Sequence, residues 1–456
     1  MMLRKQLRWS LAYNLVLVLI VSAGLTAFAE EPSMPPMPPM TEERPMAPMA
    51  ETPVMAQMPM ASMMMVPPKS EEPWYKNIEI SGLVDAYYSY NFNHPASLTN
   101  QGVTRARNFD VEEDQFQLSL AELVIQKAPS PVGFRVDLAF GPTADLIAQH
   151  ENTGCLLLGA SCVVDANQIK GKETFKNIKQ AYISWTAPVG RGLTIDVGKF
   201  ETWMMAEMTE SNLNWNYSRS FIYSLAIPYF HAGIRAGYPI TDTLAVHAYF
   251  VNGWDNDTDT NRQKTFGTEI AWNPLPGLMI VQNWIGGVEG FYEPLTGQTV
   301  GTNWRNVWDT NVTYIATNKL AFMLDAVQGF EPNTTIPNPN GSFSPFRWSG
   351  VAGYARFAPT DRLAFSPRLE WFRDNGGLRT GAVHHVPGIT KTLYELTWTN
   401  EFKISKNLIT RLEFRRDMSD KNVFENQTGC TSGIPIGSLC TKNHQDTVLV
   451  GVMYTF

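Results

Sequence analysis

The sequence predicts an all-β fold: a transmembrane antiparallel β-barrel of about 16 strands, preceded by a disordered Met/Pro-rich linker. Three observations predict it. The chain opens with an export signal, residues from 76 onward alternate between apolar and polar side chains in short segments, and the last of these segments ends at Phe456. No later stretch reaches the ~20 apolar residues that a spanning helix needs, so a membrane crossing requires a closed barrel.

Residues 1–29 have the features of a cleaved secretory signal peptide. Arg4, Lys5 and Arg8 precede an apolar run over 11–28, which closes on small residues up to Ala29. An uncleaved membrane anchor is the alternative, and the shortness of the run favours cleavage. The formal net charge of −7, which cleavage makes more negative, argues against nucleic acid as a partner.

Residues 30–73 are the predicted disordered periplasmic linker. They hold 11 of the chain's 20 Met and 12 of its 30 Pro, with few side chains that a core would bury. A copper(I) site is the alternative, because thioethers suit that soft ion. Methionines three apart in polyproline II are ~9 Å apart along the axis, however, so three sulfurs would not reach one ion. We expect no metal and no cofactor.

Residues 74–456 form the predicted barrel domain. Sixteen strand-like segments are joined by short polar turns that alternate strictly with long loops, which places both ends of the domain on the short-turn side. Outer-membrane barrels have this layout, with tight periplasmic turns and long outer loops. Aromatic residues recur near the ends of the apolar faces, as in an aromatic girdle. A soluble sandwich also alternates, but would not repeat the pattern over so many strands.

The polar strand faces predict the wall of the lumen. A barrel of this size has a diameter of ~30 Å, which side chains cannot fill, so we expect the inward charges to be solvated without special partners. Reflection of the last hairpin about Lys406 places Glu401 opposite Arg411 and Thr397 opposite Arg415. Acidic early strands and basic late strands either form opposed walls that orient dipolar solutes or merely keep the pore wet. The predicted lumen-wall residues are Glu79, Asp85, Arg135, Asp137, Asp196, Arg235, Arg356, Arg368, Glu401, Arg411 and Arg415.

The segment 201–227 is the predicted pore constriction. It is long and rich in Met, Trp, Tyr and Phe, which an outer loop in water would not need but a loop packed inside a barrel would. We expect its acidic residues to face basic residues of the late strands. The rival segment is 141–175. The predicted constriction residues are Glu201, Glu207, Glu210 and Arg219.

The four cysteines form two close pairs in the sequence. Their spacing contains no CxxC, which leaves thioredoxin-like, zinc-ribbon and c-type haem chemistry unsupported. In an exported protein such pairs favour disulfides that each pin one outer loop, and free thiols are the alternative. The expected disulfides are Cys155–Cys162 and Cys430–Cys440.

Several phrases resemble the OmpL-like outer-membrane β-barrel porin family: Ile80-Ser-Gly-Leu-Val-Asp-Ala-Tyr-Tyr-Ser-Tyr90, Pro131-Val-Gly-Phe-Arg-Val-Asp-Leu138 and Gly198-Lys-Phe-Glu201, with similar phrases at 216–220 and 227–233. The resemblance implies a passive pore for small hydrophilic solutes in the outer membrane of a Gram-negative bacterium. The closing strand also resembles that of outer-membrane barrels, in which the final Phe, here Phe456, belongs to the signal read by the barrel-assembly machinery. Its surroundings would be outer-membrane lipid, and the sequence leaves monomer and homo-oligomer (trimer) open.

Two other function classes remain. A barrel scaffold could sleeve or anchor a periplasmic or envelope partner, with the linker as its tether. An outer-membrane barrel enzyme is a more distant alternative, because acyl-transfer chemistry needs a nucleophile and a base at one height. His231 and His247 are the histidines on predicted strands, and no Ser or Asp is evidently aligned with either.

Overall fold

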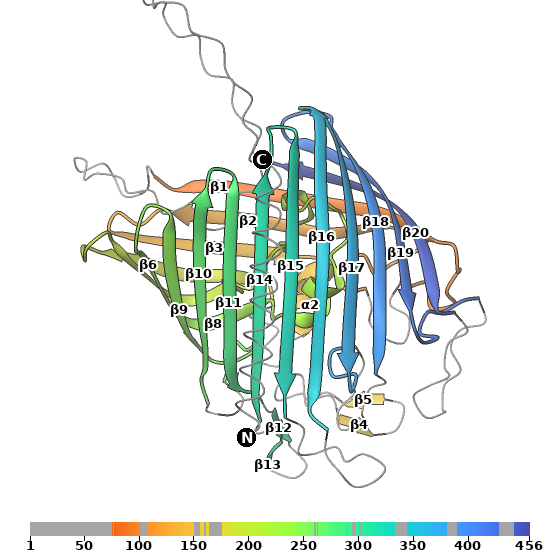
Figure 1. Ribbon diagram of the computed structural model, residues 1–456, viewed down its shortest axis with the longest axis horizontal. Helices are drawn as coiled ribbons and strands as arrows, with labels where there is room; N and C mark the ends of the chain where they lie inside the picture. The colour runs from red at the N-terminus through yellow and green to blue at the C-terminus, as the bar shows by residue number, and fades with distance from the viewer. Residues whose placement is uncertain are drawn as a thin grey trace, which may run out of the picture. The chain divides into compact units, whose positions relative to one another are not determined.

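The computed structural model describes residues 75, 77–100, 107–149, 156–158, 161–163, 176–259, 261, 263–289, 291–293, 298–300, 303–332, 344–380, 390–427 and 442–456. Its main feature is a closed antiparallel barrel of sixteen strands that follow one another in chain order (Figure 1). The predicted fold class and strand number are therefore confirmed. The predicted signal peptide and linker lie outside the described residues.

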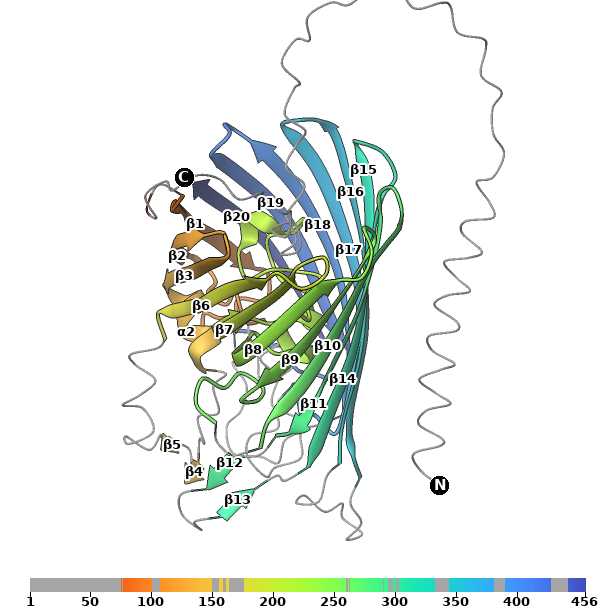
Figure 2. The same ribbon diagram turned by 90° about the vertical axis from the view of Figure 1, so that its left-hand side faces the viewer.

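All barrel strands except β9, which has 8 residues, reach the 9 residues or more with which a tilted strand crosses a membrane. Figure 2 shows the strands running at a slant around the barrel. The barrel strands are β1 (Glu79–Asn91), β2 (Gln115–Lys127), β3 (Val132–Phe140), β6 (Ile178–Ala187), β7 (Leu193–Glu201), β8 (Phe230–Pro239), β9 (Leu244–Val251), β10 (Thr265–Leu275), β11 (Leu278–Val288), β14 (Trp304–Ile315), β15 (Leu320–Glu331), β16 (Phe346–Thr360), β17 (Leu363–Asn375), β18 (Lys391–Lys403), β19 (Leu408–Ser419) and β20 (His444–Thr455).

The long connections carry a few small elements of their own. Among the described residues, no helix is long and apolar enough to cross a membrane. The elements outside the barrel wall are α2 (Pro142–Gln149), the hairpins β4 (Leu156–Leu158)/β5 (Ser161–Val163) and β12 (Phe291–Glu293)/β13 (Gln298–Val300), the 3₁₀ turn η3 (Ser211–Leu213) and the π-helical turn η4 (Ile222–Ala226).

The alternation along each strand separates an apolar outer face from a polar inner face. On β17, Leu369 is 61% exposed on the outside, whereas Arg368 and Glu370 are buried on the inside. Strand side chains point alternately to the two faces of a sheet, so a lipid-facing surface and a charged interior come from the same segments. The apolar residues exposed on the other strands follow the same rule.

The barrel closes where the last strand meets the first. β20 pairs with β1 in antiparallel register, and beyond β20 the amide of Phe456 donates a 3.1 Å hydrogen bond to the carbonyl of Gly82, whose amide donates to Phe456 in return. As a whole residue, Phe456 is 56% exposed. The register of the last hairpin is as predicted, with Glu401 opposite Arg411 and Thr397 opposite Arg415.

Candidate functional site in the barrel lumen

The connection between β7 and β8, residues 202–229, lies inside the barrel and is called the lumen loop below. Phe221 and Ile222 are fully buried, and Trp203, Met204 and Tyr217 are at most 7% exposed. Burial of these side chains is favourable at roughly 25 cal/mol per Å² of apolar area, so the apolar residues that singled out this segment also hold it in the lumen. The predicted location of the segment is confirmed, whereas its role as a constriction stays a prediction.

The lumen loop is bound to the late strands through buried charged groups. Arg368 donates to Glu207 at 2.6 Å and also to Glu395 on β18 at 2.8 Å. The carboxylate of Glu370 accepts the backbone amides of Phe221 and Ile222 at 2.6 and 2.7 Å. Charge-assisted hydrogen bonds of this kind are about twice as strong as neutral ones.

A second late-strand carboxylate and two arginines hold the middle of the loop. Glu413 on β19 accepts the amide of Tyr217 at 2.7 Å and that of Ser218 at 3.1 Å. Arg411 donates to the carbonyl of Asn216 at 3.0 Å, and Arg415 donates to the carbonyl of Arg219 at 2.6 Å. Backbone amides and carbonyls of the loop are therefore hydrogen-bonded to side chains of the barrel wall, because buried polar groups need a partner.

The other side of the loop reaches the early strands. Lys179 on β6 lies among Glu122 at 2.7 Å, Glu201 at 3.3 Å and Glu210, all buried. On β1, Asp85 accepts the hydroxyl of Tyr217 at 2.7 Å. β1 is separated from β19 only by β20, but β7, where the loop begins, and β17 have seven strands between them in both directions around the closed barrel. Because the loop is bound to β17, it spans the lumen.

Three glycines on the barrel strands leave the space that side chains of the lumen loop occupy. A Cβ on Gly451 of β20 would overlap the ring of Tyr217, one on Gly267 of β10 would overlap Trp203, and one on Gly350 of β16 would lie 2.8 Å from the side chain of Ile222. Glycine inside a strand marks a place where another group approaches closely. The wall is therefore shaped to receive the loop on strands far apart around the barrel.

Other connections also turn inward. In the connection between β1 and β2, Phe109 packs against Tyr223 and Tyr229 of the lumen loop. Between β9 and β10, Asp255 accepts the amide of Tyr229 at 2.5 Å. Burial raises the pKa of the Asp255 carboxyl from 3.8 to about 7, against the lowering effect of the backbone donors.

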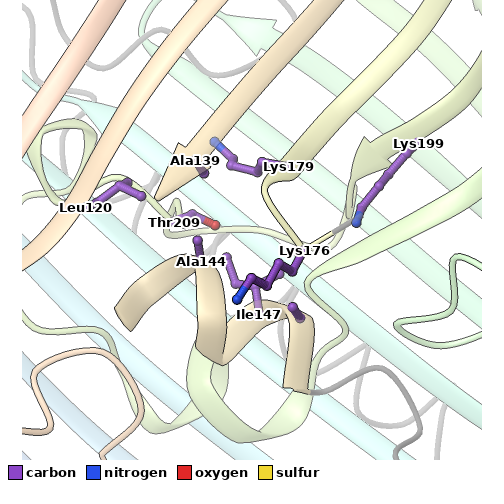
Figure 3. Close-up of a pocket in the computed structure, with 9 residues that line it drawn as sticks. Leu120, Ala139, Ala144, Ile147, Lys176, Lys179, Lys199 and Thr209 are labelled. Atoms are coloured by element: carbon purple, nitrogen blue, oxygen red, sulfur yellow. The ribbon is translucent and has the colours of Figure 1, made fainter. Parts of the chain in front are cut away.

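Helix α2, from the rival segment 141–175, packs beside the lumen loop. Figure 3 shows a small pocket between them, in which Ala144 and Ile147 of α2 face Thr209 of the loop, with Lys179 and Lys199 above. Both predicted segments thus contribute to the lumen. Lys179 is already matched by three carboxylates and Lys199 pairs with Asp257 at 3.0 Å, so this pocket is not a simple basic site.

The expectation that the lumen charges are solvated and unpaired is wrong for most of the predicted wall residues. The lumen loop and its neighbours displace water, so the charges need partners. Glu79 is the exception, since it is exposed near the short-turn end of β1. The remaining pairs are Arg135–Asp137 at 2.9 Å, Arg235–Asp196 at 2.6 Å, Arg356–Glu401 at 2.6 Å, Arg411–Glu401 at 2.7 Å and Arg415–Asp417 at 2.7 Å.

The alternative of opposed acidic and basic walls also disagrees with the structure. The late strands carry inward carboxylates beside their arginines, and Glu370 lies directly opposite Glu395, which lies opposite Asp417. The expectation for the loop acids is half right: Glu207 pairs with late-strand Arg368, whereas Glu210 pairs with Lys179 on an early strand. Glu207 and Glu210 are three residues apart, so one short stretch of the loop reaches both β17 and β6 through its side chains.

The predicted wall residues do not include five charged residues that the structure places in the lumen: Lys179, Glu122, Glu370, Glu395 and Glu413. All five occupy inward positions of amphipathic strands, so their facing could have been inferred from the same alternation that identified Arg411 and Arg415. The partners of these residues could not have been inferred in this way, because they lie on distant segments of the chain. Cys155, Cys430 and Cys440 lie outside the described residues, as does the side chain of Cys162, and both disulfides stay predictions.

The histidines on the strands are already engaged. His231 contacts the carbonyl of Gly253 at 3.0 Å and the hydroxyl of Thr202 at 3.3 Å, and His247 contacts Glu269 at 2.8 Å. Among the described residues, no group of three or more His, Cys, Asp or Glu side chains is arranged to hold a metal ion.

Comparisons with known proteins agree with this architecture. The family model described as "Putative beta-barrel porin-2, OmpL-like" matches residues 77–456. No curated protein sequence matches significantly. Among solved structures, the chain is similar to the anion-selective porin from Comamonas acidovorans (10% identity, TM-score 0.51, covering 83% of this chain and 99% of that one). It is also similar to the outer membrane channel DcaP of Acinetobacter baumannii (11% identity, TM-score 0.50, covering 83% and 97%).

At these identities the structural likeness establishes the fold alone, and the family match over the whole barrel establishes kinship. A closed sixteen-stranded barrel with an apolar exterior, a charged interior and an inward loop is the arrangement of a diffusion pore. The chain belongs to the OmpL-like β-barrel porin family and is a porin of the outer membrane.

Proposed function

We propose that this porin passes small hydrophilic solutes passively, and that the lumen loop sets the width of the pore. The observation that carries the proposal is the attachment of the loop to Lys179 on β6 and to Arg368 on β17, which are separated by six strands even by the shorter way around the closed barrel. An object fixed on both sides of a ~30 Å cylinder narrows it permanently.

Water access from the short-turn end supports the same function. Arg135, Arg235 and Arg356 lie three or four residues from the short-turn ends of their strands, and their side chains are 31%, 26% and 17% exposed inside the barrel. Solvent that reaches charged groups inside a lipid-embedded wall forms a vestibule for polar solutes. His231 and His247 already contact Gly253, Thr202 and Glu269, which favours a channel over the enzyme alternative.

Deletion of residues 206–218 tests the role of the loop. It removes Glu207, Glu210 and Tyr217 while leaving every strand intact, and we expect a higher single-channel conductance in planar bilayers together with passage of larger sugars in liposome swelling. Heat-modifiable migration on gels checks that the barrel has folded. Folded protein with unchanged conductance would show that this loop is not the constriction and would make α2 and its loop the candidate.

The cellular context completes the proposal. We infer that residues 1–29 are removed on export, that 30–73 remain as a periplasmic linker, and that the assembly machinery of the outer membrane recognises Phe456. The exposed position of Phe456 beside β1 supports its availability for recognition. Sequencing of the mature amino terminus, expected to begin at Glu30, and sedimentation in detergent, to distinguish a trimer from a monomer, test these points.

A further inference from the structure

We propose that the pore prefers cations to anions, an inference that rests on the proposed pore function and adds the charge class of its solutes. Among the buried charged side chains that the structure describes, carboxylates outnumber lysines and arginines by roughly three to one. The half-buried inner cations, which include Arg135, Arg235 and Arg356, reduce this excess without reversing it. An excess of one sign inside low-dielectric walls focuses the potential along the lumen.

The excess is concentrated in carboxylates without a cationic partner. Within the described chain, no lysine or arginine nitrogen lies within 4.0 Å of the carboxylates of Asp85, Asp309, Asp325, Glu370 or Glu413. Their hydrogen bonds come from neutral donors. The amides of the lumen loop serve Glu370 and Glu413, and loop hydroxyls serve Asp85. A neutral donor stabilises a carboxylate but leaves its charge in the field of the pore.

Strand register places several of these groups in a continuous acidic row. Asp417 of β19 lies opposite Glu395 of β18, which lies opposite Glu370 of β17, and Ala352 of β16 separates Glu370 from Asp325 of β15. Like charges directly across strands destabilise a sheet. Arg368 and Arg415 offset this cost at the β17–β19 end of the row, by pairing with Glu395 and Asp417.

The β15 end of the row has no such arginine in contact. Asp325 and Asp309 of β14 are bridged on the inner face by the side-chain amide of Asn311, which also lies 3.3 Å from Asp309. Both carboxyl groups accept side-chain amides: Asn283 donates to Asp309 and Asn311 donates to Asp325, both at 3.0 Å. Next to them on β10, Glu269 contacts His247 and Tyr249. This part of the wall, from β10 to β15, therefore presents negative charge balanced chiefly by neutral donors.

The charges of this lumen differ from those of a pore that selects anions. An anion filter needs cations whose charge is not already cancelled at the narrowest point. Here Lys179 lies among three carboxylates, and Arg411 and Arg415 pair with Glu401 and Asp417 while they donate to the loop backbone. These three positive groups are thus compensated. Arg219 of the lumen loop is a buried cation that donates only to the backbone carbonyls of Tyr217 and Thr209, and five carboxylates without a cationic partner outnumber it.

The test is the reversal potential of the purified full-length protein in a planar bilayer, with a tenfold KCl gradient at low total salt. We expect a potential of the sign that shows K⁺ to be more permeant than Cl⁻. The double variant Asp309→Asn/Asp325→Asn keeps the shape and hydrogen bonding of the pair but removes its charge, and should lower the permeability ratio about twofold, less at high salt where screening is stronger. Glu269→Gln should act in the same direction.

The matched control is Asp361→Asn, the same chemical change in an exposed turn between β16 and β17, and it should leave the ratio unaltered. Conductance with Cl⁻ more permeant, or with a ratio that the double variant does not lower, would overturn the cation preference while the pore function stands. A folded protein that does not conduct at all would overturn both. Circular dichroism and heat-modifiable migration identify any variant that has not folded, and Glu269→Gln then carries the test.

Discussion

Arg368 on β17 and Glu207 in the lumen loop form a 2.6 Å ion pair in which neither side chain is more than 2% exposed. The two residues are 161 positions apart in the chain. The same guanidinium donates to Ser218 of the loop and to Glu395 of the wall. One side chain thus joins two parts of the loop to two strands, and its removal should affect the loop more than the barrel.

Replacement of Arg368 by Gln should loosen the lumen loop. It leaves Glu207 and Glu395 buried with less compensation, and breaking a buried pair in this way costs about 3–5 kcal/mol. We expect higher and noisier single-channel conductance and faster proteolysis within 202–229. Arg373→Gln is the control, since Arg373 lies on the same strand but faces outward, where it is exposed. Equal conductance in the two variants would contradict the role assigned to Arg368.

Gly451→Ala should displace the ring of Tyr217 from its position against β20. The added Cβ overlaps the ring, so either the ring moves and its hydrogen bond to Asp85 is lost, or β20 shifts. Overpacking of this kind typically costs about 1–3 kcal/mol. Urea unfolding followed by tryptophan fluorescence measures the loss.

The matched control for this substitution is Gly353→Ala. A Cβ at Gly353 meets no atom within 4 Å, so stability should stay close to that of the parent protein. If the two glycine variants are equally stable, the close approach of Tyr217 to β20 is not maintained in solution.

The stability of the protein should fall as the pH rises from about 4 to about 7, through Asp255. Its folded pKa of about 7 lies above the ordinary 3.8, so within this window the folded state binds a proton that the unfolded state has released. Stability is therefore greatest below the window and decreases by up to about 1.4 kcal/mol per pH unit inside it.

Asp255→Asn removes this titration and should flatten the dependence in that window, as measured by urea unfolding at pH 4.5, 5.5 and 6.5. Asp361→Asn, an exposed aspartate in a turn, should retain the slope of the parent. A slope that is the same in all three proteins would show that another group is responsible.

The cysteines should form two local disulfides, Cys155–Cys162 and Cys430–Cys440. Each closes a short loop, so its expected contribution to stability is only ~2–3 kcal/mol. Non-reducing peptide mapping should recover each pair within one peptide or one pair of neighbouring peptides. A link between Cys155 and Cys430, or thiols that are alkylated in the native protein, would refute the assignment.

The barrel could be predicted from the sequence because its signals are local. Alternation along a strand decides which residues face inward, and a tight turn decides register, so the opposition of Glu401 and Arg411 followed from the hairpin alone. The apolar residues of 201–227 likewise predicted that this segment enters the lumen.

The partners inside the lumen could not be predicted in the same way. The bond from Asn216 to Ser366 joins residues 150 positions apart, and no periodicity relates them. The partner of Glu210 depends on where the loop turns, which is decided by three-dimensional packing against Gly267, Gly350 and Gly451. The expectation of solvated charges was wrong for the same reason, because it assigned the interior to water before the loop contacts were known.

The attachment of the lumen loop has a consequence for the order of assembly. The loop is synthesised in the middle of the chain, yet Arg368, Glu370, Arg411 and Glu413, which hold it, belong to strands that follow much later. Gly451, against which Tyr217 of the loop packs, lies on β20 itself, the strand that closes the barrel against β1. Contacts so distant in sequence form late in folding. The loop can therefore settle fully only when the seam is closed, so that the last step of building the wall is also the step that narrows the pore.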